Sequence, residues 1–122
     1  MIVAGFGFTT SASADSLRQA LQATGCVGVP DRVATAQDKA DARAFQQFAE
    51  TLPCHIIAVP APTLTAMTTQ TQSAQSQAAR GTGSVAEAAA LAAAGPGATL
   101  IHTRAISQDR RATCAIAKGQ DT

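Results

Sequence analysis

The sequence has no tryptophan, no tyrosine and only four phenylalanines among 122 residues. Alanine, present 29 times, supplies much of the hydrophobic fraction of 46%. A core built from such small side chains requires helices and strands that pack at short distances. The length is enough for one hydrophobic core and leaves no room for a second, so we expect a single domain over residues 1–122.

Long apolar runs and clusters of like charge are also missing. No hydrophobic stretch approaches the roughly 20 residues of a membrane-spanning helix, and no signal-peptide pattern precedes Ile2. The nine Lys and Arg residues are scattered along the chain, without the neighbouring aromatic residues of a nucleic-acid-binding surface. We therefore expect a cytoplasmic protein that binds neither membranes nor nucleic acids.

Cysteine and histidine are too few to suggest a metal site. Cys26, Cys54 and Cys114 are odd in number and lie far apart without a C-x-x-C motif, which argues against a disulfide framework or a zinc ribbon. We interpret them as small buried hydrophobic residues. The only histidines are His55 and His102, and Cys54 and His55 would point to opposite faces of a strand. We predict no bound metal and no cofactor.

Strand and helix patterns alternate along most of the chain. The β-branched run at 55–59 is typical of a strand buried on both faces, and we place it at the centre of the sheet. A helix is expected over 38–52. A polar turn at 107–111 has hairpin length, so the strands on either side of it are expected to be antiparallel. These patterns predict an α/β fold, a three-layer αβα sandwich with a mostly parallel central sheet and an antiparallel C-terminal strand pair.

The segment 68–83 departs from this alternation. It is rich in Thr, Gln and Ser, and it contains no hydrophobic residue larger than alanine. It is therefore either a surface loop with a short polar helix or a mobile cover over a binding site, and the sequence leaves both interpretations open.

The clearest binding signal lies where the first strand meets the first helix. Glycines at this point permit a turn in which backbone comes close to a ligand, and Ser13 is the expected N-cap of the helix. The amides and hydroxyls of such a turn suit a phosphate or a carboxylate. The predicted binding residues of this stretch are Gly5, Phe6, Gly7, Phe8, Thr9, Thr10, Ser11 and Ser13.

Two alternatives for this turn stay open. The glycines could serve only to make a tight connection between strand and helix. The stretch could also bind a dinucleotide, although Thr10 occupies the position of the third glycine in that fingerprint and no acidic residue ends the second strand.

A second helix start is predicted to reach the same crevice. Ser84 and Glu87 form an S-x-x-E capping pattern directly after Gly83. Ligands bind beyond the carboxyl ends of parallel strands, where Lys39 and Arg104 would form an electropositive rim. The alternatives are that Lys39 is a solvated helix charge and that Glu87 only caps its helix. We predict these five residues as part of the binding site, and no motif identifies a catalytic residue.

With these pieces in place, the sequence resembles the cobalamin-biosynthesis family of CobE and the C-terminal domain of CbiG, over nearly its whole length. The resemblance is carried by the glycine turn with the helix start at 13–17, by Lys39, by the block GSVAEAAAL at 83–91 and by the strand ATCAIA at 112–117. The block at 84–91 is the most specific of these. The sequence departs from the family at Thr9 and Thr10, where arginine often follows the glycine turn.

The resemblance implies a role in corrin-ring synthesis, whose intermediates are tetrapyrroles with many acetate and propionate side chains. It implies that the chain binds a corrinoid or precorrin intermediate for handover or for assistance in ring synthesis, with other enzymes of the pathway as partners. The alternative from the same family is a CbiG-like hydrolase that opens a ring lactone, with Lys39 or Glu87 assisting. A nucleotide-binding Rossmann-like module is the minor alternative.

Overall fold

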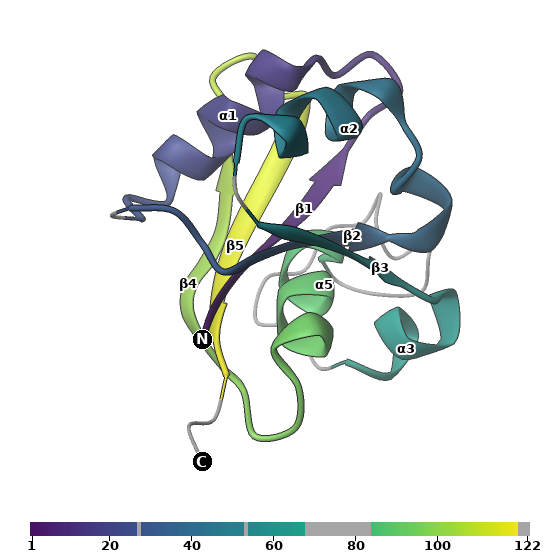
Figure 1. Ribbon diagram of the computed structural model, residues 1–122, viewed down its shortest axis with the longest axis vertical. Helices are drawn as coiled ribbons and strands as arrows, with labels where there is room; N and C mark the ends of the chain where they lie inside the picture. The colour runs from purple at the N-terminus through teal and green to yellow at the C-terminus, as the bar shows by residue number, and fades with distance from the viewer. Residues whose placement is uncertain (27, 53, 68–83, 120–122) are drawn as a thin grey trace.

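The computed structural model describes residues 1–26, 28–52, 54–67 and 84–119, and the predicted polar segment at 68–83 lies outside the described residues. Strands and helices follow one another along the chain (Figure 1). In chain order they are β1 (Ile2–Phe8), α1 (Ala14–Ala23), β2 (Arg32–Ala36), the 3-10 turn η1 (Gln37–Lys39), α2 (Arg43–Glu50), β3 (His55–Val59), α3 (Ala61–Ala66), α5 (Val85–Ala94), β4 (Thr99–Ile106) and β5 (Ala112–Lys118).

The described strands form one five-stranded sheet in the order β3-β2-β1-β5-β4. β1 pairs with β2, and β2 with β3, in parallel. β5 is antiparallel to both of its neighbours, β1 and β4. Four strands therefore run in one direction, and β5, inserted between two of them, runs in the other. The α/β class, the mostly parallel strand direction and the antiparallel C-terminal pair are confirmed.

The prediction that strand 55–59 lies at the centre of the sheet is wrong, because β3 is an edge strand and β1 is central. His55 and Ala58 are exposed. The run is nevertheless apolar because Ile56 packs against the hydrophobic cluster on one face and Ile57 against the cluster on the other. A continuous apolar run indicates that both faces of the strand are covered, and this is also true of an edge strand that lies beneath helices.

The helix predicted over 38–52 is shorter and begins later than expected. Lys39 lies in η1, and α2 starts only at Arg43. Between them Ala42 is extended, with φ −60° and ψ 136°. The side-chain amide of Gln46 donates to the carbonyl of Ala40 at 2.6 Å and so satisfies an acceptor that a continuous helix would have used itself.

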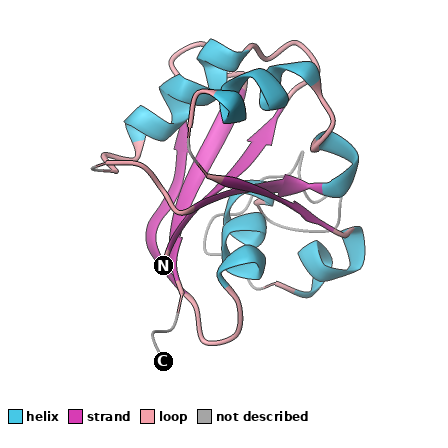
Figure 2. Ribbon diagram, viewed as in Figure 1, coloured by secondary structure: helices cyan, strands magenta, loops and turns pink. Residues whose placement is uncertain are grey.

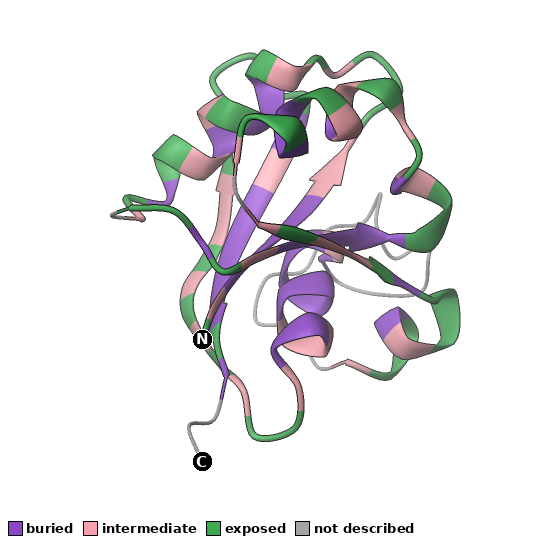
Figure 3. Ribbon diagram, viewed as in Figure 1, coloured by how far each residue is buried: buried purple, intermediate pink, exposed green. Residues whose placement is uncertain are grey.

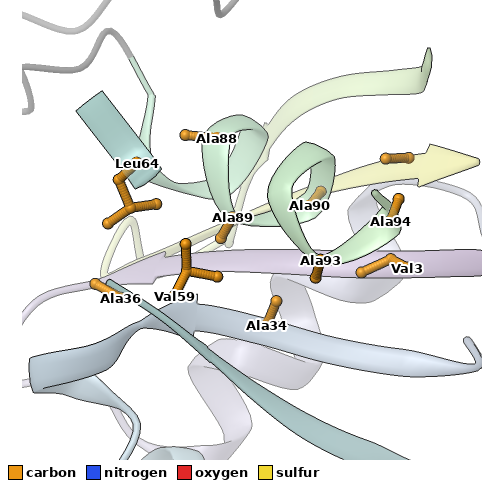
Figure 4. Close-up of a cluster of buried hydrophobic side chains, with 11 residues drawn as sticks. Val3, Ala34, Ala36, Val59, Leu64, Ala88, Ala89, Ala90, Ala93 and Ala94 are labelled. Atoms are coloured by element: carbon orange, nitrogen blue, oxygen red, sulfur yellow. The ribbon is translucent and has the colours of Figure 1, made fainter. Parts of the chain in front are cut away.

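Helices cover both faces of the sheet (Figure 2). A separate hydrophobic cluster fills each layer. Under α1 and α2 the buried side chains are large and include Phe6, Leu17, Phe45 and Phe48. Under α5 and α3 they are mainly alanine and valine (Figure 4). The three-layer sandwich predicted from the sequence is therefore present, with one thick and one thin layer. None of the helices in the described ranges is long and apolar enough to cross a membrane.

The thin layer results from the close approach of α5 to β1. α5 is buried along most of its length (Figure 3), and its inner residues are alanines. A Cβ atom at Gly5 would lie 2.1 Å from the carbonyl oxygen of Ala86 and 2.4 Å from the amide nitrogen of Ala90. Both contacts are with backbone, which cannot rotate away. Glycine at position 5 is therefore required for α5 to lie where it does.

We predict that Gly5→Ala destabilises the fold by about 3 kcal/mol or more, since the added methyl group must push α5 away from the sheet. Urea unfolding of the purified variant measures this change. Gly7→Ala is the matched control, because its Cβ would meet the Thr113 hydroxyl at 3.0 Å and the Val85 Cβ at 3.3 Å, contacts that small shifts can relieve. Equal stability of the two variants would contradict the prediction.

Candidate functional site

A cavity of about 580 Å³ opens at the end of the sheet where β1 and β2 end. It lies between the loop that follows β1, the turn η1 and the first turn of α2. The described structure brings five of the predicted site residues to this cavity: Phe8, Thr9, Thr10, Ser13 and Lys39. The remaining lining residues are Ala12, Asp38, Ala42, Arg43, Ala44 and Gln47.

The floor of the cavity is aromatic and its rim is basic. The ring of Phe8 is parallel to that of Phe45, with an interplanar angle of 4° and centroids 5.8 Å apart. The ammonium of Lys39 lies over Phe8, 5.2 Å from the ring centroid, which is the geometry of a cation–π contact. Arg43, at the first position of α2, adds an exposed guanidinium. The cavity therefore presents two cations and the carboxylate of Asp38 beside an apolar surface.

The wall formed by the loop after β1 ends in a capped helix. The Ser13 hydroxyl accepts from the amide of Ser16 at 3.2 Å, and the Ser16 hydroxyl accepts from the amide of Ser13 at 3.0 Å. This reciprocal pair is a capping box, and the prediction that Ser13 is the N-cap of the helix is confirmed. Asp15 follows in the first turn, where its hydrogen bond from Arg18 lowers the pKa of the carboxyl group. The start of α1 is thus fixed by its own side chains.

The turn between β4 and β5 holds this wall from behind. The buried Ser16 hydroxyl donates to Asp109 at 2.5 Å, and Ser107 donates to the other carboxylate oxygen at 2.6 Å. These two hydrogen bonds lower the pKa of Asp109. At the other end of the loop, the amide of Thr9 donates to the carbonyl of Arg111 at 2.9 Å. Both ends of the cavity loop are therefore tied to residues about a hundred positions later in the chain.

Three of the predicted residues build the sheet and do not line the cavity. Gly5 faces α5, and Phe6 is fully buried between the rings of Phe45 and Phe48. The carbonyl of Gly7 accepts from the hydroxyl of Thr113 at 3.2 Å. Ser11, also predicted, is exposed, and its hydroxyl lies 3.0 Å from that of Thr9, so it supports a lining residue.

The second predicted helix start lies on the opposite face of the sheet. Ser84 caps α5, and its hydroxyl accepts from the amide of Glu87 at 3.3 Å. Glu87 is completely buried, and its carboxylate accepts from the backbone amide of Arg104 at 2.9 Å. Gly83 lies outside the described residues. The structure therefore does not bring Ser84, Glu87 and Arg104 to the cavity that Lys39 lines.

The hydrogen bond from the backbone amide of Arg104 to the Glu87 carboxylate has a structural explanation. The pairing of β4 with β5 shifts register between His102 and Ala105, so the strand is irregular at Arg104. The amide of Arg104 points instead at α5, where Glu87 accepts it. A buried carboxylate thus joins α5 to the edge strand.

The cysteine prediction is confirmed for one residue. Cys114 is fully buried, and burial raises the pKa of its thiol well above the ordinary value. Cys26 and Cys54 are half-buried, and burial raises both of their pKa values as well. All three are free thiols. Within the described residues, no three His, Cys, Asp or Glu side chains gather as metal ligands would.

Comparison with protein families decides where this fold belongs. A family model described as the cobalamin synthesis G C-terminus matches residues 2–117. The chain belongs to this family. Membership places it among the proteins of cobalamin biosynthesis and confirms the resemblance found in the sequence. By sequence alone, no curated protein is significantly similar to the chain.

Solved structures of cobalamin-biosynthesis proteins share the fold of this family member. CobE, a protein from the cobalamin (vitamin B12) biosynthetic pathway, is 30% identical, with a TM-score of 0.85 over 98% of this chain and 91% of that chain. The cobalamin biosynthesis protein chiG from Agrobacterium tumefaciens str. C58 is 33% identical, with a TM-score of 0.73 over 99% and 100% of the two chains. A cobalamin biosynthesis protein G homologue from Sulfolobus solfataricus, 17% identical, shares the fold with a TM-score of 0.67. The match covers 98% of this chain and 37% of that longer one.

Reasoning from the sequence missed four residues that shape the site in this member of the cobalamin synthesis G C-terminal family. Asp38, Arg43 and Gln47 line the cavity together with Lys39. Arg43 and Gln47 are four positions apart, which puts them on one face of a helix and could have indicated a shared surface. Asp109 carried no local signal, because its bond to Ser16 spans 93 positions of sequence.

We predict that Asp109→Asn lowers the Tm at neutral pH, because an amide offers one acceptor oxygen where the carboxylate offers two. Asp109 has a folded pKa below its ordinary value of 3.8, so its stabilising effect is present above that pH and is lost as the pH falls through the folded pKa. The Tm difference between wild type and variant should accordingly shrink below about pH 4. Thermal unfolding between pH 2.5 and pH 7 measures it.

The matched control is Asp41→Asn, which changes an exposed carboxylate in the loop between η1 and α2. Its Tm should follow that of the wild type at every pH. A difference for Asp109→Asn that persists unchanged at the lowest pH, or one no larger than that of the control, would remove the role assigned to this carboxylate.

Proposed function

We propose that this chain binds a polycarboxylated corrinoid or precorrin intermediate of cobalamin biosynthesis and holds it for handover or for assistance in ring synthesis. The cavity at the ends of β1 and β2 is the proposed binding site. The observation that carries this proposal is the combination of Lys39 and Arg43 with the Phe8 floor in a protein of the cobalamin synthesis G C-terminal family.

The chemistry of the ligand supports this choice of site. Corrin precursors carry acetate and propionate carboxylates around an apolar macrocycle. In the described part of the chain, neither Lys39 nor Arg43 is engaged in an ion pair, so both can bind carboxylates without first breaking one. Hydrogen bonds to charged groups are worth about 1.5–3 kcal/mol each. Thr9 and Thr10 add exposed hydroxyl donors where the family often has arginine.

The hydrolase alternative needs a general base that activates water. Glu87 is unsuited to act together with Lys39, since it is buried on the other side of the sheet and accepts from Arg104. Asp38 lines the cavity beside Lys39 and is the carboxylate to which a lactone-opening reaction would be assigned. Binding of a dinucleotide in the same cavity is the third alternative. In that case the dinucleotide is itself the ligand, and no further cofactor is required.

One titration separates these functions. Purified protein is mixed with lactone-bearing precorrin intermediates and with a metal-free corrin, and the absorption spectrum is followed over time. A saturable spectral change without new product supports binding for handover. A new species that accumulates beyond one equivalent of protein would establish the hydrolase. Binding of NAD with no response to corrinoids would reject both.

We predict that Lys39→Ala weakens corrinoid binding about tenfold, corresponding to the loss of ~1.4 kcal/mol from one charge-assisted contact. The wild-type affinity should also fall as salt rises, because the contact is partly exposed. Titration monitored by absorption gives both values. Lys118→Ala is the control, since Lys118 is exposed and pairs with Ile2 at the opposite end of β1. If the two variants bind equally well, Lys39 is only a solvated charge.

A further inference from the structure

The four phenylalanines of the chain are all described, and only Phe8 among them is partly exposed. Phe6, Phe45 and Phe48 are buried. The ring of Phe8 already stacks on Phe45, and the ammonium of Lys39 lies over it. The sequence has no tryptophan or tyrosine that could take this part. A flat macrocycle therefore finds one phenylalanine ring, already in contact with Phe45 and Lys39, and no wider aromatic platform on which to stack.

The size of the cavity points in the same direction. A volume of about 580 Å³ lies within the range of cavities that enclose one drug-sized ligand. A corrin with four rings and all its acid side chains is larger than such a ligand. The cavity can therefore enclose one part of the macrocycle and must leave the rest outside.

The charges of the cavity match one ring. A ring of an early corrin precursor carries one acetate and one propionate, and the cavity offers two cations, Lys39 and Arg43, beside one carboxylate, Asp38. The contact with Phe8 holds the ammonium of the partly exposed Lys39 5.2 Å from the ring centroid, within reach of a carboxylate on a ring that enters edge-on. The apolar residues Phe8, Ala42 and Ala44 line the same cavity, and their surface suits the carbon skeleton of the ring.

From these observations we infer that the cavity recognises a single pyrrole-derived ring with its two acid side chains, edge-on, and leaves the other rings of the macrocycle outside. This inference rests on the proposed function, because it specifies how the same cavity binds a corrinoid. Its consequence is that a second protein can bind the exposed rings before this protein releases the macrocycle.

The test uses two probes, a metal-free corrin with free carboxylates (hydrogenobyrinic acid) and porphobilinogen, a single pyrrole with one acetate and one propionate. The corrin is titrated first, and porphobilinogen is then added as competitor. We predict that porphobilinogen displaces the corrin at millimolar concentration, whereas pyrrole without acid side chains does not. Arg43→Ala should weaken both probes by the same factor, about tenfold, and Lys118→Ala should weaken neither.

The outcomes separate the inference from the proposed function. Failure of the corrin to bind overturns both. Binding of the corrin without displacement by porphobilinogen leaves the proposed function intact and overturns single-ring recognition. A second measurement is quenching of the bound corrin's fluorescence by acrylamide. Bound corrin should be quenched at more than half the rate of free corrin, and near-complete shielding would contradict edge-on binding.

Discussion

The contact of α5 with β1 constrains the whole molecule. A helix can approach a strand this closely only where both lack bulky side chains, and here Gly5 faces the backbone of Ala86 and Ala90. The layer under α5 accordingly contains alanine where other sandwiches have leucine or isoleucine. With so little volume available on this face, every phenylalanine of the chain belongs to the opposite one.

That asymmetry determines on which face of the sheet the cavity lies. The thick layer extends to the end of β1, where Phe8 stacks on Phe45 and forms a floor that reaches the surface. On the thin side, the corresponding helix start is closed, because Ser84 and Glu87 are buried and Glu87 is bonded to the edge strand. The cavity therefore lies on the side of α1 and α2. The basic residues beside it come from η1 and the start of α2.

The sequence predicted those parts of this arrangement that depend on local chemistry. Ser13 and Ser84 cap helices because their hydroxyls reach amides within the next turn, and Lys39 lies at the cavity because the chain leaves a parallel strand there. Sheet order was not predictable in the same way. The run at 55–59 is apolar at the edge of the sheet because Ile56 and Ile57 each contact a different cluster, so its composition does not distinguish edge from centre.

Long-range contacts set the limit of prediction at the site itself. That two capped helix starts lie at one end of a sheet follows from the strand directions, but the face that each helix covers depends on side-chain volume summed over the whole layer. Glycine at position 5 admits α5 on one face, and Phe6 requires α2 on the other, so the two starts are separated by the sheet. Lys39 therefore lines one cavity with Arg43, four positions further along, and not with Arg104. Both cations of the proposed site come from one short stretch, which agrees with the proposed recognition of a single ring of the ligand.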